Sequence, residues 1–288
     1  MITTRIAIIT DIHHGPASAT KSGDQALGLL KSFAEFVHKE QPDLILEMGD
    51  RISDVDGDTD IKNQTEIAEI FKTMDSPVFH ICGNHDRVNL SIEQNEVILG
   101  QELASEVIDA GDWQIVLWRA NTKIDLSNIN VGFLVDNHEL IWLEHVMKNA
   151  DKPCLVVSHV PLSGHSQIGN YYFENQPACS KYDADRDIRA ILANCPQPVI
   201  CLSGHVHWNT VTNINGIYYL TQQSLTETFT TQGKPAAAWG TLELNNSVNW
   251  NVYGYDEFSF CTTPNSERWK DPRPGKAFYK NLHMQIRG

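Results

Sequence analysis

Five short motifs in this sequence carry aspartate, histidine and asparagine side chains, which are common ligands of divalent metal ions. In chain order they are Asp11-Ile12-His13, Gly49-Asp50, Gly83-Asn84-His85-Asp86, His159 and Gly204-His205-Val206-His207. Their donor atoms are nitrogen and oxygen with no thiolate. Such a set suits Mn, Fe, Zn, Co or Ni rather than a structural zinc knuckle.

The number of ligands predicts two ions rather than one. Seven side chains in these motifs are candidate ligands: Asp11, His13, Asp50, Asn84, His159, His205 and His207. Seven ligands are too many for one catalytic ion that must keep an open position. They suit two ions that share a bridging carboxylate.

Each motif follows a short apolar run that is typical of a buried strand. Strands are predicted at residues 6–10, 44–48, 78–82, 154–158 and 199–203. In open α/β sheets, ligands gather outside the carboxyl ends of the strands. We therefore expect all five motifs to meet in one crevice.

Helical periodicity alternates with these strands, which indicates the α/β class. Helices are predicted at 24–40, 63–74, 138–149 and 183–193, and antiparallel strands at 210–221, 238–244 and 247–253. This order predicts sheets packed together and flanked by helices. We assign residues 1–260 to one domain. Residues 261–288 hold six Lys/Arg, two acidic residues and three prolines, and are predicted to be a basic tail on the surface or against another subunit.

Charge and composition restrict the classes of molecule that this chain is expected to bind. The formal charge is −14, and only the tail after residue 260 is basic. Nucleic acid and anionic membranes are therefore poor partners, and a nuclease is disfavoured. No apolar run is long enough to span a membrane. The apolar run near the N-terminus is short and ends at Asp11, so we interpret it as a strand rather than a signal peptide. The cysteines show no CxxC spacing. We expect a cytoplasmic protein.

The ordered motifs resemble those of the calcineurin-like metallophosphoesterases, whose pattern runs DxH, GD, GNH(D/E), H, GHxH. The match spans roughly residues 5–225. The resemblance implies a four-layer αββα sandwich of two mixed β-sheets between helices. It also implies one ion on Asp11, His13, Asp50 and His207, and a second on Asp50, Asn84, His159 and His205.

The same resemblance implies the roles in hydrolysis. A metal-bridging hydroxide would be the nucleophile, and His85, oriented by Asp86, would assist the leaving group. The chemistry is consistent with this, because two cations screen the charge that protects a phosphoester and lower the pKa of bound water. The histidine ligands need outer hydrogen-bond acceptors, for which Asp54 or backbone carbonyls are candidates.

For two residues beside the motifs, the sequence allows two interpretations each. Arg51 follows the bridging Asp50 directly, and it is either an exposed side chain of a polar loop or a contact to the substrate phosphate. His14 is either a bystander or a member of the site. The family commonly has an acidic or amide residue three positions after Asp50, where this chain has Ser53, followed by Asp54.

Two subgroups of the family share features with this chain. The segment from His138 to Leu143 and the Ser158-His159-Val160-Pro161 run are similar to bacterial class III cyclic-nucleotide phosphodiesterases, although Glu139 stands where Gln is usual. The segment from Ser224 to Thr228 resembles the Mn-dependent ADP-ribose/CDP-alcohol diphosphatases. We expect hydrolysis of a small, nucleotide-like phosphodiester, with a pyrophosphate as the alternative. A catalytically silent scaffold would show substitutions in the motifs, and this chain shows none.

The loop at residues 161–182 is predicted to form a wall of the substrate pocket. It follows His159 directly, and long loops in compact domains are usually functional. Its rings at Tyr171, Tyr172 and Phe173 suit stacking on a nucleobase. The alternative is that they seal a contact between subunits of a homo-oligomer.

Overall fold

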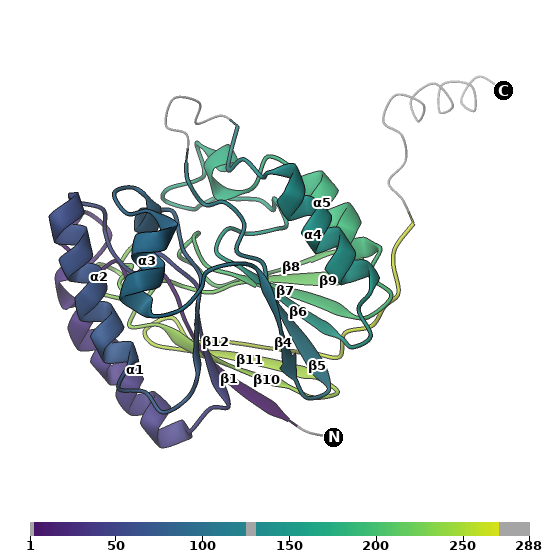
Figure 1. Cartoon of the computed structure of the whole chain (residues 1–288), viewed down its shortest axis with the longest axis horizontal. Coiled ribbons are helices and arrows are strands. Elements are labelled where there is room, and N and C mark those ends of the chain that lie inside the picture. Colours follow the sequence, from purple (N-terminus) through teal and green to yellow (C-terminus); the bar gives the residue numbers. More distant parts are fainter. Residues whose placement is uncertain (1–2, 125–130, 271–288) are drawn as a thin grey trace.

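Two six-stranded β-sheets pack face to face in the computed structural model, which describes residues 3–124 and 131–270 (Figure 1). The strands of the first sheet are β1 (Thr4–Ile9), β2 (Leu44–Glu47), β3 (Val78–His80), β10 (Trp239–Leu244), β11 (Val248–Tyr253) and β12 (Phe258–Thr262). Those of the second are β4 (Glu106–Ala110), β5 (Trp113–Leu117), β6 (Cys154–Ser158), β7 (Val199–Ser203), β8 (Thr210–Ile214) and β9 (Ile217–Thr221).

Both sheets are mixed. The first has the order β12-β11-β10-β1-β2-β3, in which β1, β2 and β3 run parallel and the other pairs are antiparallel. The second has the order β4-β5-β6-β7-β9-β8, with antiparallel pairs at its two edges. The parallel strands β1, β2, β3, β6 and β7 are those that precede the five motifs.

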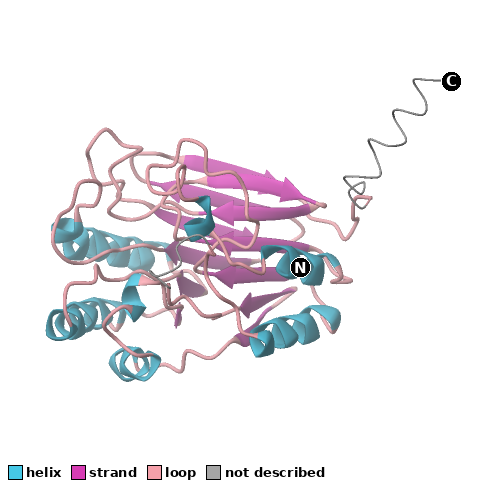
Figure 2. Ribbon diagram, turned by 90° about the horizontal axis from the view of Figure 1, so that it is seen from above, coloured by secondary structure: helices cyan, strands magenta, loops and turns pink. Residues whose placement is uncertain are grey.

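Helices cover the outer faces of both sheets, as the view from above also shows (Figure 2). The helices α1 (Ala26–Glu40) and α2 (Gly57–Phe71) pack on the first sheet, and α3 (Ile92–Leu99) packs against α2. The helices α4 (Asn137–Lys148) and α5 (Asp185–Ala193) pack on the second sheet.

Alternation of side chains along the strands explains the layers. In β1, Ile6 and Ile8 enter the core between the sheets, whereas Ala7 and Ile9 face the helices. In β6, Leu155 and Val157 also point into the core between the sheets. Successive side chains of a strand point to opposite faces, so apolar strands that are buried on both faces build three cores between four layers. The predicted four-layer fold is confirmed.

Some predicted elements differ from the structure. Helix α2 begins six residues before the predicted start, because the side chain of Asp56 accepts a hydrogen bond from the Thr59 backbone N–H at 2.9 Å and caps it there. Helix α3 and strands β4, β5 and β12 were not predicted. The predicted domain boundary at residue 260 falls inside β12, and Arg268 bonds the carbonyl oxygens of Ala193 and Gln197.

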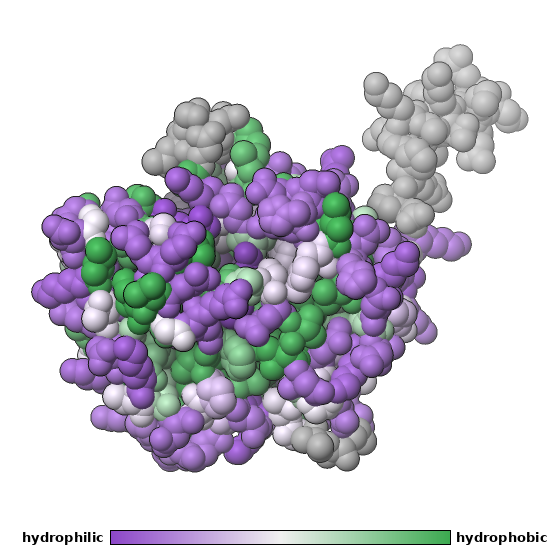
Figure 3. Space-filling view, viewed as in Figure 1, coloured by the Kyte–Doolittle hydropathy of each residue, from purple (hydrophilic) through white to green (hydrophobic). Residues whose placement is uncertain are grey.

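Residues 271–288 of the predicted tail lie outside the described residues. No helix within 3–124 and 131–270 is long and apolar enough to cross a membrane. The face seen in Figure 3 is mostly hydrophilic. Its hydrophobic residues gather mainly in the lower middle, where Figure 1 shows the strands.

Candidate metal centre

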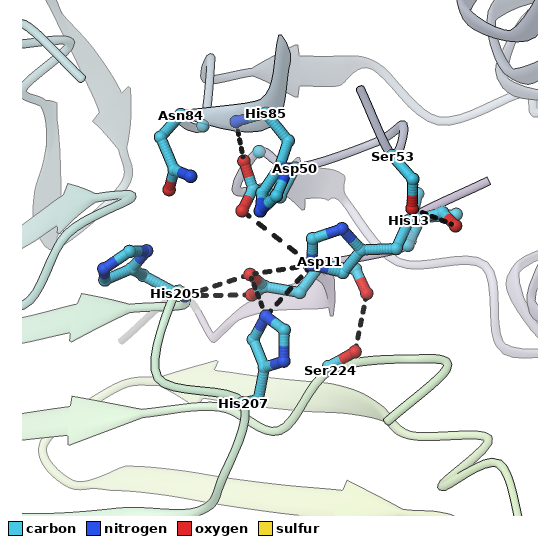
Figure 4. Close-up of polar contacts among 12 residues, drawn as sticks. Asp11, His13, Asp50, Ser53, Asn84, His85, His205, His207 and Ser224 are labelled. Carbon is cyan, nitrogen blue, oxygen red and sulfur yellow. Dashed lines mark hydrogen bonds and ion pairs between the residues drawn. The ribbon is translucent and has the colours of Figure 1, made fainter. Parts of the chain in front are cut away.

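The five motifs meet at the carboxyl ends of strands from both sheets. Asp11, Asp50 and Asn84 follow β1, β2 and β3, whereas His159 and His205 follow β6 and β7. Figure 4 shows these loops arriving from both sheets with their polar side chains turned toward a common space. This is the crevice expected from the sequence.

The side chains form two groups that share one carboxylate. Asp11, His13, Asp50 and His207 make one group, and Asp50, His159 and His205 make the other; within each, the possible ligand atoms lie within 4.8 Å of one another. The amide oxygen of Asn84 lies 3.3 Å from His159 Nε2, which places it with the second group. Asp50 therefore stands between the two groups.

The packing of these donors fits two cations. His13 Nε2 lies 3.0 Å from His207 Nε2, which is itself 3.2 Å from the Oδ1 atom of Asp11. All three side chains are buried. Buried charges and lone pairs that face one another need a compensating positive charge. A divalent ion bound by nitrogen and oxygen donors supplies it.

The backbone adopts an unfavourable conformation at most of these ligands. Nine described residues other than glycine have positive φ, and five of them belong to the predicted metal ligands: Asp11, His13, Asp50, His205 and His207, with φ between 50° and 66°. Positive φ is sparsely populated for residues with a Cβ, and such strain concentrates at functional sites. The fold thus holds these side chains in place against a local conformational cost.

Two glycines of the motifs allow the loops to approach one another. A Cβ atom on Gly83 would lie 2.1 Å from the Oδ1 atom of Asp50, and one on Gly204 would lie 2.5 Å from the Oδ2 atom of Asp11. The backbone nitrogen of Asp50 also obstructs Gly83 at 2.4 Å, and the hydroxyl of Thr10 obstructs Gly204 at 2.1 Å, so neither position accepts a larger residue. The glycines of the motifs are therefore required by close approach.

The electrostatics of the cluster favour bound positive charge. Burial alone would lower the pKa of His159, but the charge of Asp50 raises it to about 9. Burial likewise opposes protonation of His207, and the charge of Asp11 raises its pKa to about 9. Burial and the neighbouring His159 lower the pKa of His205 to about 3. The carboxylates hold protons on two rings when no metal ion competes for them.

Hydrogen bonds on the far side of the rings select the nitrogen that faces the cluster. His207 Nδ1 lies 2.6 Å from a carboxylate oxygen of Glu227, and His159 Nδ1 lies 2.8 Å from the Met48 carbonyl oxygen. His205 Nε2 lies 2.8 Å from the Cys179 carbonyl oxygen. Two acceptors are backbone carbonyls, as expected. Such outer contacts orient metal-binding histidines.

Asp54 binds His85 rather than a ligand histidine. Its carboxylate accepts a hydrogen bond from His85 Nδ1, and the His85 side chain is 29% exposed on the rim of the centre. Burial raises the pKa of Asp54, but the hydrogen bond and charge of His85 outweigh it and lower the pKa below its usual value. The expectation that Asp54 supports a metal ligand is wrong.

Asp86 does not touch the ring of His85, so its predicted orienting role is also wrong. Its carboxylate is buried and accepts hydrogen bonds from the backbone N–H groups of Asp50 at 2.9 Å and Gly83 at 2.8 Å. It also accepts a hydrogen bond from the backbone N–H of Arg51 at 2.9 Å. It joins the Gly49-Asp50 loop to the loop that carries Asn84.

Arg51 is buried, which contradicts the expectation of an exposed side chain. Its guanidinium donates to the Ile81 carbonyl oxygen at 2.7 Å, pairs with the carboxylate of Glu47, and lies 3.2 Å from that of Asp86. It does not line the pocket. Arg51 neutralises two buried carboxylates beneath the centre and has no path to a substrate phosphate. His14 also has a partner, since its Nε2 lies 2.8 Å from Glu66.

The segment from Ser224 to Thr228 supports the first motif from behind. Ser224 donates to the Asp11 carbonyl oxygen at 2.7 Å, and Thr226 donates to that of Ile12 at 3.1 Å. Glu227 is fully buried and binds both His207 and the hydroxyl of Tyr172 at 3.0 Å. Glu227 was not predicted as a site residue. The signals in the sequence were the resemblance of the segment to the diphosphatases and a carboxylate in an otherwise uncharged run.

A pocket of about 250 Å³ opens above the centre. Its lining includes residues of both ligand groups and part of the predicted loop: Lys21, Asp50, Asn84, His85, Ile124, Tyr172, Phe173, Gln176, Cys179, His205 and His207. The loop therefore forms a wall of the pocket, as predicted. Tyr171 does not line it; this side chain is 60% exposed and stacks on Phe229 with ring centroids 6.1 Å apart.

Comparisons with known proteins agree with this geometry. Residues 4–209 match the calcineurin-like phosphoesterase family. No curated protein sequence matches the chain. Among solved structures, a dimetal phosphatase from Danio rerio has a TM-score of 0.73 at 15% identity, with 91% of this chain and 99% of that one covered.

A second similar structure is the purple acid phosphatase PPD1 from yellow lupin (Lupinus luteus) seeds. Its TM-score is 0.61 at 13% identity, with 95% of this chain and 57% of that one covered. At these identities the likeness shows the fold. The family match and the two ligand groups confirm the prediction of a dinuclear divalent metal centre. The chain belongs to the calcineurin-like phosphoesterase family and is a metal-dependent phosphoester hydrolase.

Proposed function

We propose that this chain hydrolyses a small, nucleotide-like phosphodiester at a centre built on Asp50. The observation that carries the proposal is the pair of ligand groups that share this carboxylate at the floor of a pocket with an aromatic wall. One ion is assigned to Asp11, His13, Asp50 and His207, and the other to Asp50, Asn84, His159 and His205. When bound, such ions screen the phosphate charge, activate water and align the attacking and leaving oxygens.

His85 is proposed to assist the leaving group. Its ring lies on the rim of the centre, 4.9 Å from the His13 ring between centroids, and it lines the pocket. Because Nδ1 donates to the carboxylate of Asp54, Nε2 is the nitrogen that can hold a proton toward the substrate. General acids of this kind contribute roughly 10²–10⁴-fold to the rate.

Tyr172 and Phe173 are proposed to contact the organic part of the substrate. Both rings line the pocket, and Tyr172 also packs edge-on against His207 with centroids 5.2 Å apart. A planar base fits against such rings, and stacking contributes about 1–3 kcal/mol per base. Cyclic nucleotides are the first substrate class to be tested.

A pyrophosphate linkage is the second candidate, and the position of Glu227 favours it. This residue belongs to the Ser224–Thr228 segment that resembles the ADP-ribose/CDP-alcohol diphosphatases. It connects a proposed ligand, His207, to the pocket wall at Tyr172. The contact between this segment and the pocket wall supports the second candidate.

A panel of phosphoesters with the Mn²⁺-reconstituted protein tests the proposal. The panel holds cyclic nucleotides, ADP-ribose, CDP-alcohols, glycerophosphodiesters and a simple monoester. We expect the highest kcat/KM on a cyclic nucleotide, on ADP-ribose or on a CDP-alcohol. Hydrolysis of the simple monoester alone would contradict it. The absence of any hydrolysis by fully metallated protein would favour a silent scaffold.

A further inference from the structure

Lys21 is a positively charged side chain on the pocket wall that sequence reasoning did not single out. It lines the pocket together with Asp50, His85 and Tyr172, and it is the one lysine or arginine in that lining. Within residues 3–124 and 131–270, the lysines that form ion pairs are Lys39, Lys62, Lys72, Lys152 and Lys181. No described carboxylate forms an ion pair with Lys21, although Asp54 lies close enough for the charge of Lys21 to act on it.

The backbone around Lys21 is fixed to the segment that orients a proposed metal ligand. Lys21 forms an antiparallel bridge with Glu227. On either side, the Thr228 N–H donates to the Thr20 carbonyl oxygen at 2.8 Å, and the Ser22 N–H donates to that of Thr226 at 3.0 Å. The side chain of Lys21 thus starts from a fixed point beside the centre.

The ammonium group of Lys21 lies toward the reacting end of the pocket. Its nitrogen is 6.0 Å from the centroid of the Tyr172 ring. Tyr172 packs edge-on against the ring of His207 with centroids 5.2 Å apart, so the ammonium lies on the side of the pocket near this proposed ligand.

We propose that Lys21 binds a second anionic group of the substrate, next to the phosphate that is attacked. This inference rests on the proposed function and selects its second candidate, the diphosphate linkage, over cyclic nucleotides as the substrate class. A simple phosphodiester brings one negative charge, which two divalent ions already neutralise. A diphosphate brings a second phosphate, for which a lysine ammonium with three donors is a suitable partner. Arg51 is buried and cannot supply this contact.

Steady-state kinetics of the Mn²⁺-loaded protein test the proposal. The substrates are ADP-ribose, which has a diphosphate, and bis(p-nitrophenyl) phosphate, which has one charge. We expect Lys21→Met to raise KM for ADP-ribose roughly 10- to 100-fold, because a charge-assisted contact is lost, and to leave KM for the simple diester within about 2-fold. Lys21→Arg should keep KM for ADP-ribose near the wild-type value, because the positive charge remains. The control Lys39→Met removes a charge from the exposed end of α1.

A binding measurement decides the question even if neither substrate is hydrolysed. Calorimetry at fixed free Mn²⁺ compares ADP with AMP on the wild type and on Lys21→Met, after metal analysis and thermal melting confirm equal metal content and folding. We expect ADP to bind more tightly than AMP to the wild type, and this gain to disappear in Lys21→Met. An unchanged gain, or an equal loss for both ligands, overturns the proposal. If no phosphoester is hydrolysed but the gain depends on Lys21, only the proposed function fails.

Discussion

His85 differs from the other histidines of the centre in how its ring is held. Three of the ligand histidines, His159, His205 and His207, are buried and bonded to Glu227 or to backbone carbonyls. His85 is instead partly exposed and bonded to Asp54. A buried ring with a fixed tautomer suits metal binding. A ring that lines the pocket on the rim of the centre suits work on the leaving group.

Replacement of His85 should therefore slow turnover without loss of metal. We expect His85→Ala to lower kcat roughly 10²–10⁴-fold while metal analysis finds the wild-type content. The loss should be larger for alkoxide than for activated aryl leaving groups, since poor leaving groups depend more on proton donation. Asp54→Asn should also slow alkoxide substrates more than activated aryl substrates, but to a smaller extent. Loss of metal from His85→Ala would contradict this assignment.

Arg51 is predicted to contribute to stability and not to substrate binding. Arg51→Met would leave the carboxylates of Glu47 and Asp86 buried without their partner, which typically costs about 3–5 kcal/mol. Urea unfolding measures this loss, and KM in the remaining folded protein should stay near the wild-type value. The control Arg186→Met changes an exposed residue and should be nearly neutral. A raised KM of Arg51→Met with normal stability would indicate that Arg51 binds the substrate instead.

The sequence predicts the ligands better than it predicts their partners. Each ligand lies within four residues after a strand end, so local patterns place it. Asp54 and Glu227 lie 31 and 20 positions from the histidines they bind, and those contacts depend on the paths of the loops. The prediction for Arg51 failed because polar loops are usually exposed. A charged Glu47 at the end of an apolar strand was the available signal that a buried cation lies nearby.

At the scale of elements, strands with both faces buried were easy to recognise and weakly patterned elements were not. Strands β6 and β7 lie where the sequence predicts them, because continuous apolar runs identify buried parallel strands. Helix α3 has only one fully buried residue, Asn95, and strand β4 is exposed at alternate positions. Neither carries the apolar pattern on which the prediction depended.

The loop between β6 and α5 presents two adjacent tyrosines in different environments, which allows a matched comparison. Tyr172 lines the pocket, whereas Tyr171 is exposed outside it. We expect Tyr172→Leu to raise KM for nucleotide substrates roughly 5- to 100-fold through loss of stacking, and Tyr171→Leu to change it little. A small synthetic diester should be hydrolysed as before by both variants. Equal effects of the two changes would refute a stacking role, and dissociation of an oligomer would assign the rings to an interface.

At the scale of the whole molecule, the two sheets have complementary roles in the centre. The first sheet supplies Asp11, His13, Asp50 and Asn84 through its parallel strands, and the second supplies its histidines from the loops after β6 and β7. Neither sheet alone carries a complete ligand group. The packing of the sheets therefore determines the distance between the groups, and Asp50 is the residue that both groups share.

Metal stoichiometry tests the account most directly. Apoprotein prepared with a chelator should be inactive, and titration with Mn²⁺ should restore hydrolysis in step with binding. Elemental analysis of the fully active protein should find two ions per chain. Asp50→Ala should be the most damaging ligand substitution, because it removes a ligand from both groups. Full activity with no more than one ion per chain would contradict the account.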